Sequence, residues 1–396
     1  MNLSSLPALD QEMLVQSNML AIQLRKYIVE AGGWLSFSRF MEVVLYTPNL
    51  GYYSSGTRKF SEHTNDGGDF VTAPELSPLF AQTLARPIAK SLTISNTRSI
   101  IEFGAGTGKL ALGLLLELSK LHIELDEYII VDLSGELRER QHDTINTSLY
   151  NITTHIRWID ELPQSFEGVI LCNEVLDSMP VRLFSKAVGG WQERGVVIHN
   201  GEFAFYDLPV TFNDLPVILN SLDVADGYVT ETHQAALAFT KTVCTMLTRG
   251  VIFLIDYGFP AYEYYHPQRN MGTLMCHYRH HVHDDPFSYL GLQDITSHVE
   301  FTGIYKAGTS VGANLLGYTS QARFLLNAGI IDALTNIYSL NYQYFLQAAN
   351  AVHKLISESE MGELIKVISF TRGIDMSKAH TIDGFAQGDR SYTLLR

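Results

Sequence analysis

The stretch IEFGAGTGKLALGLL, residues 101 to 115, constrains the fold of this chain more than any other. A short apolar run contains Glu102, three glycines alternate at Gly104, Gly106 and Gly108, and a leucine-rich helical pattern follows. Glycine is needed where a backbone turns sharply between a strand and a helix, and where a ligand touches the main chain. The stretch therefore predicts a strand, a ligand-binding loop and a helix.

Short β-branched runs alternate with helical patterns from residue 97 onward. The segments are RSIIEF, a helix over 107–119, EYIIVD, a helix over 134–147, HIRWI, GVILCNEVLDSMP and GVIFLIDYGF. This alternation is typical of an α/β fold, in which a mostly parallel sheet carries helices on both faces. GANLLGYTSQ and LIKVISFTRG are candidates for the last two strands, and the turn HNGE predicts a β-hairpin inserted into the sheet order.

The same patterns predict how the chain divides. Residues 1–47 read as two helices and a turn, and 47–74 as a long functional loop. We expect residues 1–96 to form an amino-terminal helical segment with a lid loop. Residues 97–396 are then the main α/β domain, with inserted elements near 178–245 and 260–295.

Composition excludes several classes of function. The formal net charge is −14 and no Lys/Arg-rich run occurs, so we expect no nucleic-acid partner. No apolar stretch reaches the roughly 18 to 20 residues of a membrane-spanning helix. Three widely spaced cysteines suggest neither a disulfide framework nor a zinc site, and no signal or transit peptide is evident. A reducing cytoplasm fits these features best.

The glycine loop also limits the kind of nucleotide. Lys109 stands where a dinucleotide fingerprint needs its third glycine, and Gly-Lys-Leu lacks the Ser/Thr that ends a phosphate-binding P-loop. The loop resembles the S-adenosylmethionine loop of class I methyltransferases, whose ligand carries an ammonium and a sulfonium and no phosphate. The acid Glu102 suits such a ligand and is expected to contact it. Asp132, after the next strand, is placed to accept hydrogen bonds from ribose hydroxyls. Asp160 stands where such folds usually contact adenine. The alternative is a structural role, in which the glycines form a tight strand-to-helix turn and the acids contact no ligand.

Longer blocks are similar to one family, the MidA-like methyltransferases, whose mitochondrial members help to assemble respiratory complex I. The matching blocks are GDFVTAPELSPLF, EFGAGTGKLA, NEVLDSMPVR, LIDYGF, GTLMCHYRHH and QDITSHVEF. The chain departs at Asp132, where many relatives have Glu, and at Ser178, where many have Ala. The resemblance implies a Rossmann-like class I fold, S-adenosylmethionine as cofactor and protein arginine N-methyltransferase activity. A respiratory complex I subunit is one possible substrate. A cofactor-binding assembly chaperone with vestigial catalysis and a small-molecule methyltransferase are the alternatives.

Acids after the fourth strand are the first candidates for catalysis. A guanidinium is cationic, so carboxylates are needed to bring it to a cationic sulfonium and to hold its planar fork. Asn173, Glu174 and Asp177 follow the strand directly, and the spacing of the two acids predicts one face of a helical turn. Asn173 is also a candidate for cofactor contact. Asp177 has an alternative role as a helix or loop cap.

Other candidates are spread along the chain. Glu231, in YVTETHQAA, is a third catalytic acid, or else a first-turn helix acid favoured by the dipole. Asp256 and Tyr257 end a strand and are expected to line the pocket. Thr72, in GDFVTAP together with Phe70 and Glu75, is expected to close over cofactor or substrate as part of the lid.

The segment MCHYRHHVHDD, residues 275–285, is rich in histidine, yet we interpret it as a loop and expect no metal. His280, Asp294 and His298 fall in blocks that match the family. Substrate positioning or proton acceptance is their predicted role.

Overall fold

The computed structural model describes residues 6–55, 72–146, 153–338 and 342–396. The chain forms two compact units. Unit 1 consists of Met1–Phe70, Asp177–Leu237 and Pro260–Glu300, and unit 2 of Val71–Leu176, Ala238–Phe259 and Phe301–Arg396. Among the described residues, no helix has the length and apolar character needed to cross a membrane.

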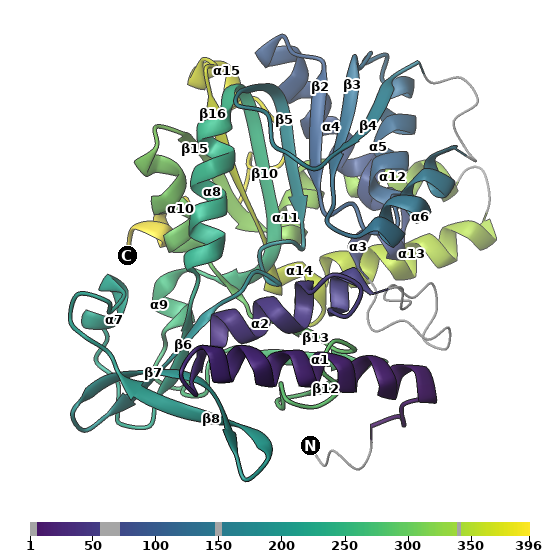
Figure 1. Ribbon diagram of the computed structural model, residues 1–396. Coiled ribbons are helices and arrows are strands. Elements are labelled where there is room, and N and C mark those ends of the chain that lie inside the picture. Colours follow the sequence, from purple (N-terminus) through teal and green to yellow (C-terminus); the bar gives the residue numbers. More distant parts are fainter. Residues whose placement is uncertain (1–5, 56–71, 147–152, 339–341) are drawn as a thin grey trace. The chain divides into compact units, whose positions relative to one another are not determined.

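Unit 2 is built on a sheet that Figure 1 shows from β15 at one side to β4 at the other. Its hydrogen-bonded order is β15 (Asn314–Ser320), β16 (Ile365–Arg372), β10 (Leu247–Phe259), β5 (Phe166–Asn173), β2 (Ser99–Phe103), β3 (Glu127–Val131) and β4 (His155–Ile159). The five strands from β10 to β4 are parallel, and β16 lies antiparallel between β10 and β15. The mostly parallel sheet and both candidate last strands are therefore confirmed.

Helices cover both faces of this sheet. They are α3 (Ala73–Leu76), α4 (Pro78–Ser95), α5 (Lys109–Lys120), α6 (Gly135–Asn146), α8 (Gln234–Met246, mainly in unit 2), α10 (Phe301–Ser310), α11 (Gln321–Asn327), α12 (Ile330–Tyr338), α13 (Tyr342–Ile356), α14 (Met361–Leu364) and α15 (Met376–Ala379), followed by the 3-10 helix η3 (Ser391–Leu395). Ile100 and Tyr128 face the buried residues of α4 and α5. On the other face the ring of Phe103 meets Phe239 of α8 edge-on, at 5.0 Å between ring centroids.

The parallel register brings the ends of four strands to one edge of the sheet. Phe103 pairs with Val131 and with Cys172, and Val131 pairs with Ile159. The residues that follow β2, β3, β4 and β5 therefore emerge together, which is where open α/β sheets bind ligands. All of the predicted cofactor contacts except Thr72 are on or directly after these strands.

Unit 1 contains two small antiparallel sheets and the amino-terminal helices. Its helical elements are α1 (Gln11–Glu30), α2 (Phe37–Tyr46), η2 (Tyr52–Ser54), α7 (Val217–Asn220) and α9 (Ala261–Tyr264). One sheet contains β1 (Leu35–Ser36), β6 (Arg182–Ala187), β7 (Gly190–His199), β8 (Glu202–Pro209) and β9 (Val229–Thr232). The other contains β11 (Met275–Tyr278), β12 (His281–His283) and β13 (Asp294–Thr296), and β14 (Val299–Glu300) follows in the chain.

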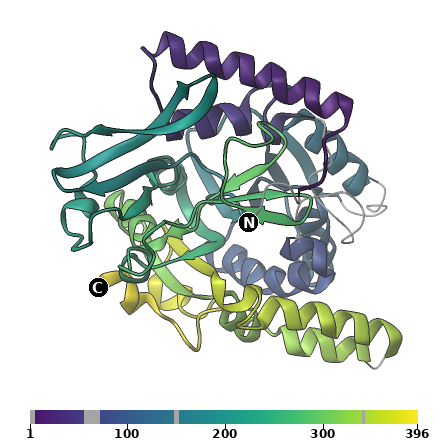
Figure 2. The ribbon, with the colours of Figure 1, turned by 90° about the horizontal axis from the view of Figure 1, so that it is seen from below.

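The hairpin expected at HNGE is β7–β8, and its turn residues Asn200 and Gly201 have φ of 50° and 86°. Two positive φ values are typical of the tight turn that suits twisted strands. The hairpin belongs to the separate sheet of unit 1 and is not inserted into the parallel sheet. Figures 1 and 2 both show α1 alongside it, and Arg25 of α1 lies 4.7 Å from the ring centroid of Phe203.

The chain divides differently from the sequence prediction. The two expected amino-terminal helices exist, but no boundary occurs at residue 96. Helix α4 belongs to unit 2 because its apolar side chains, among them Leu84 and Ile88, are buried in the core of the main sheet. Helices α1 and α2 share a core with β6 and β7, so the amino terminus and the segments 177–237 and 260–300 make one unit.

Candidate active site

The glycine loop joins β2 to α5 through three left-handed residues. Gly104, Gly106 and Gly108 have φ of 63°, 54° and 85°, a region that other residues rarely adopt. A Cβ on Gly104 would lie 3.0 Å from Val175, and one on Gly108 would lie 3.1 Å from the Gln141 backbone. The loop thus exposes bare main chain at the edge of the sheet.

Gln141 fixes the loop to its neighbours. It is completely buried, and its amide nitrogen donates to the Gly106 carbonyl (3.0 Å) and to the Asp132 carboxylate (2.7 Å). Its amide oxygen accepts the indole N–H of Trp158 at 2.8 Å. Sequence reasoning missed this residue. The available signal was a glutamine in the buried stripe of α6, at helical spacing between Leu137 and Ile145.

Asp132 is held in one orientation. The residue is buried, and besides Gln141 its carboxylate accepts the backbone N–H of Ser134 at 2.9 Å. Asp160 differs, because its side chain is exposed and pairs with Arg138 at 2.6 Å. The Arg138 guanidinium also donates to the Asp132 carbonyl, which ties the ends of β3 and β4 together. Ribose contact by Asp132 and adenine contact by Asp160 stay predictions.

Glu102 lies in the interior of unit 2. It is 2% exposed, and its carboxylate accepts the Tyr128 hydroxyl at 2.6 Å. Burial raises the pKa of Glu102 to about 7; the Tyr128 hydrogen bond opposes this shift, and the charge of Asp132 adds to it. Contact between Glu102 and a cofactor stays a prediction. Thr72, also buried, directly precedes α3, and Phe70 lies outside the described residues.

The turn after β5 has an unusual conformation. Glu174 has a left-handed φ of 53°, and its backbone N–H donates to the Ile255 carbonyl at 2.8 Å. The side-chain amide of Asn173 donates to the Glu174 carboxylate at 3.1 Å. The other end of this amide, the buried Oδ1 of Asn173, has no hydrogen-bond partner among the described residues. An orphaned acceptor beside a carboxylate is a place where a ligand N–H group can bind.

A buried carboxylate holds this turn in place. Asp256 is completely buried and accepts the backbone N–H groups of Val175 (3.1 Å), Leu176 (2.8 Å) and Tyr257 (2.8 Å). We expected Asp256 to line the pocket, and the structure gives it these backbone contacts instead. Strained residues persist where the surroundings over-determine them, and they cluster at functional sites. By binding the two residues that follow Glu174, Asp256 helps to hold Glu174 in its left-handed conformation.

The helical turn predicted from the spacing of Glu174 and Asp177 does not form. Residues 174–177 are a bend and a turn, because the left-handed Glu174 and the Asp256 contacts impose another path. Asp177 is half-buried in unit 1, where its carbonyl accepts the Ser297 N–H at 2.9 Å. Burial raises the pKa of Asp177 to about 7, against the lowering effect of the Ser178 and Asp177 backbone N–H groups.

Asp294 lies near two stacked tyrosines in unit 1. Both of its carboxylate oxygens accept the Tyr53 hydroxyl at 2.9 Å, and the ring centroids of Tyr53 and Tyr46 are 5.5 Å apart. Tyr46 donates to the carbonyl of Ser178, the residue after Asp177. Burial, followed by the charge of Asp294, holds the pKa of Tyr53 well above its usual range. Asp294 and Asp177 are thus neighbours of one aromatic pair.

Glu231 has a structural environment. It is completely buried, and its carboxylate accepts the backbone N–H groups of Thr273 (2.8 Å) and Leu274 (3.0 Å) and the Tyr264 hydroxyl (2.7 Å). A Cβ on Gly272 would lie 2.2 Å from one of its oxygens. These contacts join β9 to the segment before β11, so we do not retain Glu231 as a candidate catalytic residue.

The histidine segment is a β-hairpin and not the loop that we expected. β11 pairs with β12, and the turn residues Arg279 and His280 have φ of 46° and 64°. His280 is exposed at this turn. Within the described parts of the chain, no group of three or more His, Cys, Asp or Glu residues is arranged to hold a metal ion. The expectation of no metal stays a prediction.

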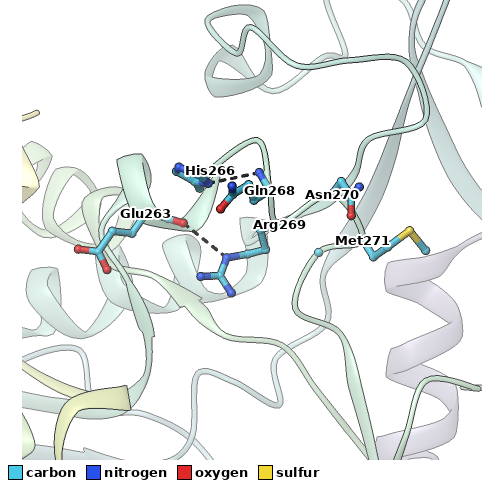
Figure 3. Close-up of a pocket in the computed structure, with 7 residues that line it drawn as sticks. Glu263, His266, Gln268, Arg269, Asn270 and Met271 are labelled. Atoms are coloured by element: carbon cyan, nitrogen blue, oxygen red, sulfur yellow. Dashed lines mark hydrogen bonds between the residues drawn. The ribbon is translucent and has the colours of Figure 1, made fainter. Parts of the chain in front are cut away.

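An open pocket of about 510 Å³ lies elsewhere in unit 1 (Figure 3). It is lined by Glu263, His266, Gln268, Arg269, Asn270, Met271 and Gly272. Arg269 donates to the Glu263 carbonyl and the Gln268 N–H donates to His266, so the rim is stabilised by local bonds. None of the predicted site residues lines this pocket.

Comparison with known proteins decides the family. Residues 83–319 match the model of a family described as "Putative S-adenosyl-L-methionine-dependent methyltransferase". The chain belongs to this methyltransferase family. A Burkholderia thailandensis protein bound to S-adenosyl-homocysteine is 60% identical, with a TM-score of 0.94 over 98% of this chain and 100% of that one. Another structure from the same organism is 59% identical, with a TM-score of 0.91 over 98% of this chain and 100% of the other.

Curated relatives are more distant. The mitochondrial protein arginine methyltransferase NDUFAF7 of Danio rerio is 26% identical over 86% of this chain and 84% of its own length. The Caenorhabditis elegans homologue is 25% identical over 79% and 78%. The predicted MidA-like resemblance, the class I methyltransferase fold and S-adenosylmethionine as the cofactor of the family are therefore confirmed.

The glycine loop of this chain fits such a cofactor. Its bare backbone and the oriented Asp132 carboxylate offer acceptors for hydroxyl and N–H donors. The one lysine of the loop, Lys109, forms an ion pair with a carboxylate. We expect Gly104, Gly106, Gly108, Asp132, Asp160 and Asn173 to hold the cofactor.

Proposed function

We propose that this methyltransferase methylates arginine side chains of proteins. The observation that carries the proposal is the turn after β5, where the Asn173 amide binds the Glu174 carboxylate through Nδ2 and its buried Oδ1 has no partner among the described residues. A guanidinium presents several N–H groups in one plane, so it matches two adjacent acceptors. The arginine methyltransferases among the relatives support this choice of acceptor.

The residues of the turn would act mainly by alignment and charge. The bound cofactor supplies a methyl group on a sulfonium, which is an electrophile for in-line displacement. The Glu174 carboxylate offsets the repulsion between the two cations and orients the planar fork. Asn173 holds Glu174 through its amide nitrogen and accepts a substrate N–H at Oδ1. Glu174 is also the basic group of this turn that can take the proton lost by the methylated nitrogen.

Asp177 and Asp294 are further candidates for substrate contact. Asp177 and Asp294 bring carboxylates close to the stacked rings of Tyr46 and Tyr53, and guanidinium groups bind both carboxylates and aromatic faces. His280 and His298 remain candidates for positioning. A respiratory complex I subunit remains the partner that the family resemblance suggests, and no nucleic-acid partner is expected. Three buried cysteines without disulfides fit a reducing cytoplasm.

The acceptor chemistry can be tested with three matched peptide pools. The pools share random flanks and differ only in a central arginine, lysine or citrulline. Citrulline keeps a planar group with N–H donors but lacks the charge. We expect methylation of the arginine pool alone, because the Glu174 contact needs both the fork and the charge. Methylation of the lysine pool would contradict the proposal.

A further inference from the structure

One buried glutamine of α6 links three elements around the predicted cofactor site of unit 2. Gln141 is completely buried, and its amide reaches the glycine loop, the end of β3 and a side chain of β4. Its Nε2 donates to the Gly106 carbonyl at 3.0 Å and to Oδ2 of Asp132 at 2.7 Å. A side-chain amide has two N–H donors, so both are used within the protein.

Trp158 of β4 determines which way this amide points. An indole N–H can only donate, and that of Trp158 donates to Oε1 of Gln141 at 2.8 Å. A flipped amide would place N–H groups against the indole N–H and its oxygen against the Asp132 carboxylate. The Trp158 ring is stacked on His142, with 3.6 Å between ring centroids. The amide of Gln141 therefore has one favourable orientation.

The Asp132 carboxylate is fixed at both of its oxygens. The Ser134 N–H donates to Oδ1 at 2.9 Å, and the Gln141 amide donates to Oδ2. A carboxylate offers about four lone-pair sites, which is more than these two donors occupy. An acceptor that already has its bound orientation favours binding, because no free energy is spent on ordering it when the ligand arrives.

We propose that Gln141 and Trp158 are positioning residues for ribose recognition: the indole orients the amide, and the amide holds the Asp132 carboxylate ready for the hydroxyl groups of the cofactor ribose. The same amide sets the spacing between this carboxylate and the glycine loop at Gly106. Neither positioning residue is assigned a contact with the cofactor. The inference builds on the predicted ribose contact of Asp132 and is independent of arginine as the methyl acceptor.

Calorimetric titration with two ligands tests the proposal without any turnover. The ligands are S-adenosylhomocysteine and its analogue that lacks both ribose hydroxyls, and the ratio of their dissociation constants is the hydroxyl penalty. Hydrogen bonds to a carboxylate are strong, so the penalty of the unmodified protein should be about tenfold or more. In Gln141→Leu we expect S-adenosylhomocysteine to bind about tenfold more weakly and the penalty to fall to about threefold or less.

Two further variants test the same contacts separately. Trp158→Phe keeps an aromatic ring beside His142 and removes only the indole donor, so the amide loses its fixed direction and the hydroxyl penalty should again fall. Asp132→Ala should abolish the penalty. Adding Gln141→Leu to Asp132→Ala should then change the penalty no further, because both residues act through one carboxylate.

Gln321→Leu is the matched control for a loss of stability. Gln321 is another buried glutamine of unit 2, and its amide donates to the Leu355 carbonyl of α13 at 3.0 Å. The same substitution at this position should lower stability and leave the hydroxyl penalty unchanged. An equal fall of the penalty in Gln321→Leu would show a general effect of destabilisation and overturn the assignment to Gln141.

The full hydroxyl penalty in a folded Gln141→Leu or Trp158→Phe protein would overturn the proposal. If Asp132→Ala keeps the full penalty, the ribose acceptor is another residue and the proposal is wrong. Failure of both Gln141→Leu and Trp158→Phe to fold would give these residues a purely structural role, which also contradicts it.

Discussion

Two acidic regions of this molecule look alike in the sequence and differ in the structure. The turn after β5 leaves Asn173 Oδ1 without a partner beside Glu174, whose backbone is left-handed. Around Glu231, by contrast, two backbone N–H groups and a tyrosine hydroxyl all bind the carboxylate. A buried acid with donors at both oxygens stabilises the fold, whereas a strained turn with an open acceptor is suited to a ligand. The unpartnered buried acceptor of Asn173 therefore separates the turn after β5 from the surroundings of Glu231.

The largest effect expected from this comparison is on turnover, in Glu174→Gln. The variant keeps the size of the side chain and loses the charge-assisted bonds to the acceptor. Turnover should fall roughly 30- to 1000-fold, equivalent to about 2 to 4 kcal/mol. Cofactor affinity should change by no more than about twofold. Rate and calorimetric assays measure the two quantities separately.

Glu167→Gln is the matched control, since Glu167 lies on the same strand at its opposite end and pairs with Arg249. Its turnover should equal that of the unmodified protein. Full activity in Glu174→Gln would show that Glu174 is not a catalytic residue, and the two acidic regions would then not differ in function.

Glu231→Gln should act on stability. The amide oxygen of the variant can still accept the N–H groups of Thr273 and Leu274, but the hydrogen bonds of this buried group lose their charge assistance, so we expect a loss of about 1 to 3 kcal/mol in the free energy of unfolding. Urea denaturation measures this loss. Turnover per folded molecule should stay unchanged. A stable variant with low turnover would return Glu231 to the catalytic candidates.

Glu102 extends the comparison to pH. Its folded pKa of about 7 lies above the ordinary value of 4.5, so the folded state binds the proton more tightly than the unfolded chain does. The stabilisation that Glu102 provides is therefore fully present at pH values below its unfolded-state pKa. It is lost as pH rises through the folded-state pKa, and the total loss is roughly 3 kcal/mol in the free energy of unfolding.

Glu102→Gln should remove this part of the pH dependence while keeping an acceptor for Tyr128. Urea denaturation of both proteins at about pH 5 and pH 8 measures it, because the stability of the variant relative to the unmodified protein should rise with pH. Parallel pH profiles for the two proteins would show that Glu102 titrates normally.

The smallest expected effect is in Asn173→Ala, which removes the open acceptor and the hydrogen bond to Glu174. One neutral hydrogen bond is worth about 1 kcal/mol, so the KM for the protein acceptor should rise about fivefold to tenfold. Steady-state kinetics with varied acceptor measure this. An unchanged KM and turnover would mean that Oδ1 meets no ligand.

Local signals made the fold and the glycine loop predictable from the sequence. The loop, the parallel strands and Asp132 follow one another within a short stretch, and strand and helix periodicity are local properties. The supports of the site are not local. Gln141 binds Gly106 from 35 residues away, and Asp256 binds Val175 from 81 residues away. The left-handed Glu174 depends on such contacts, which is why spacing alone predicted a helical turn there.

We propose that this chain transfers a methyl group from S-adenosylmethionine to protein arginine. The most direct test incubates the purified protein with methyl-labelled S-adenosylmethionine and a lysate of cells that lack the gene, followed by peptide mass spectrometry. We predict label on arginine of one or a few proteins, and little label with Glu174→Gln. Label on RNA, lysine or a metabolite would contradict the claim. Tight cofactor binding without any label would favour an assembly chaperone instead.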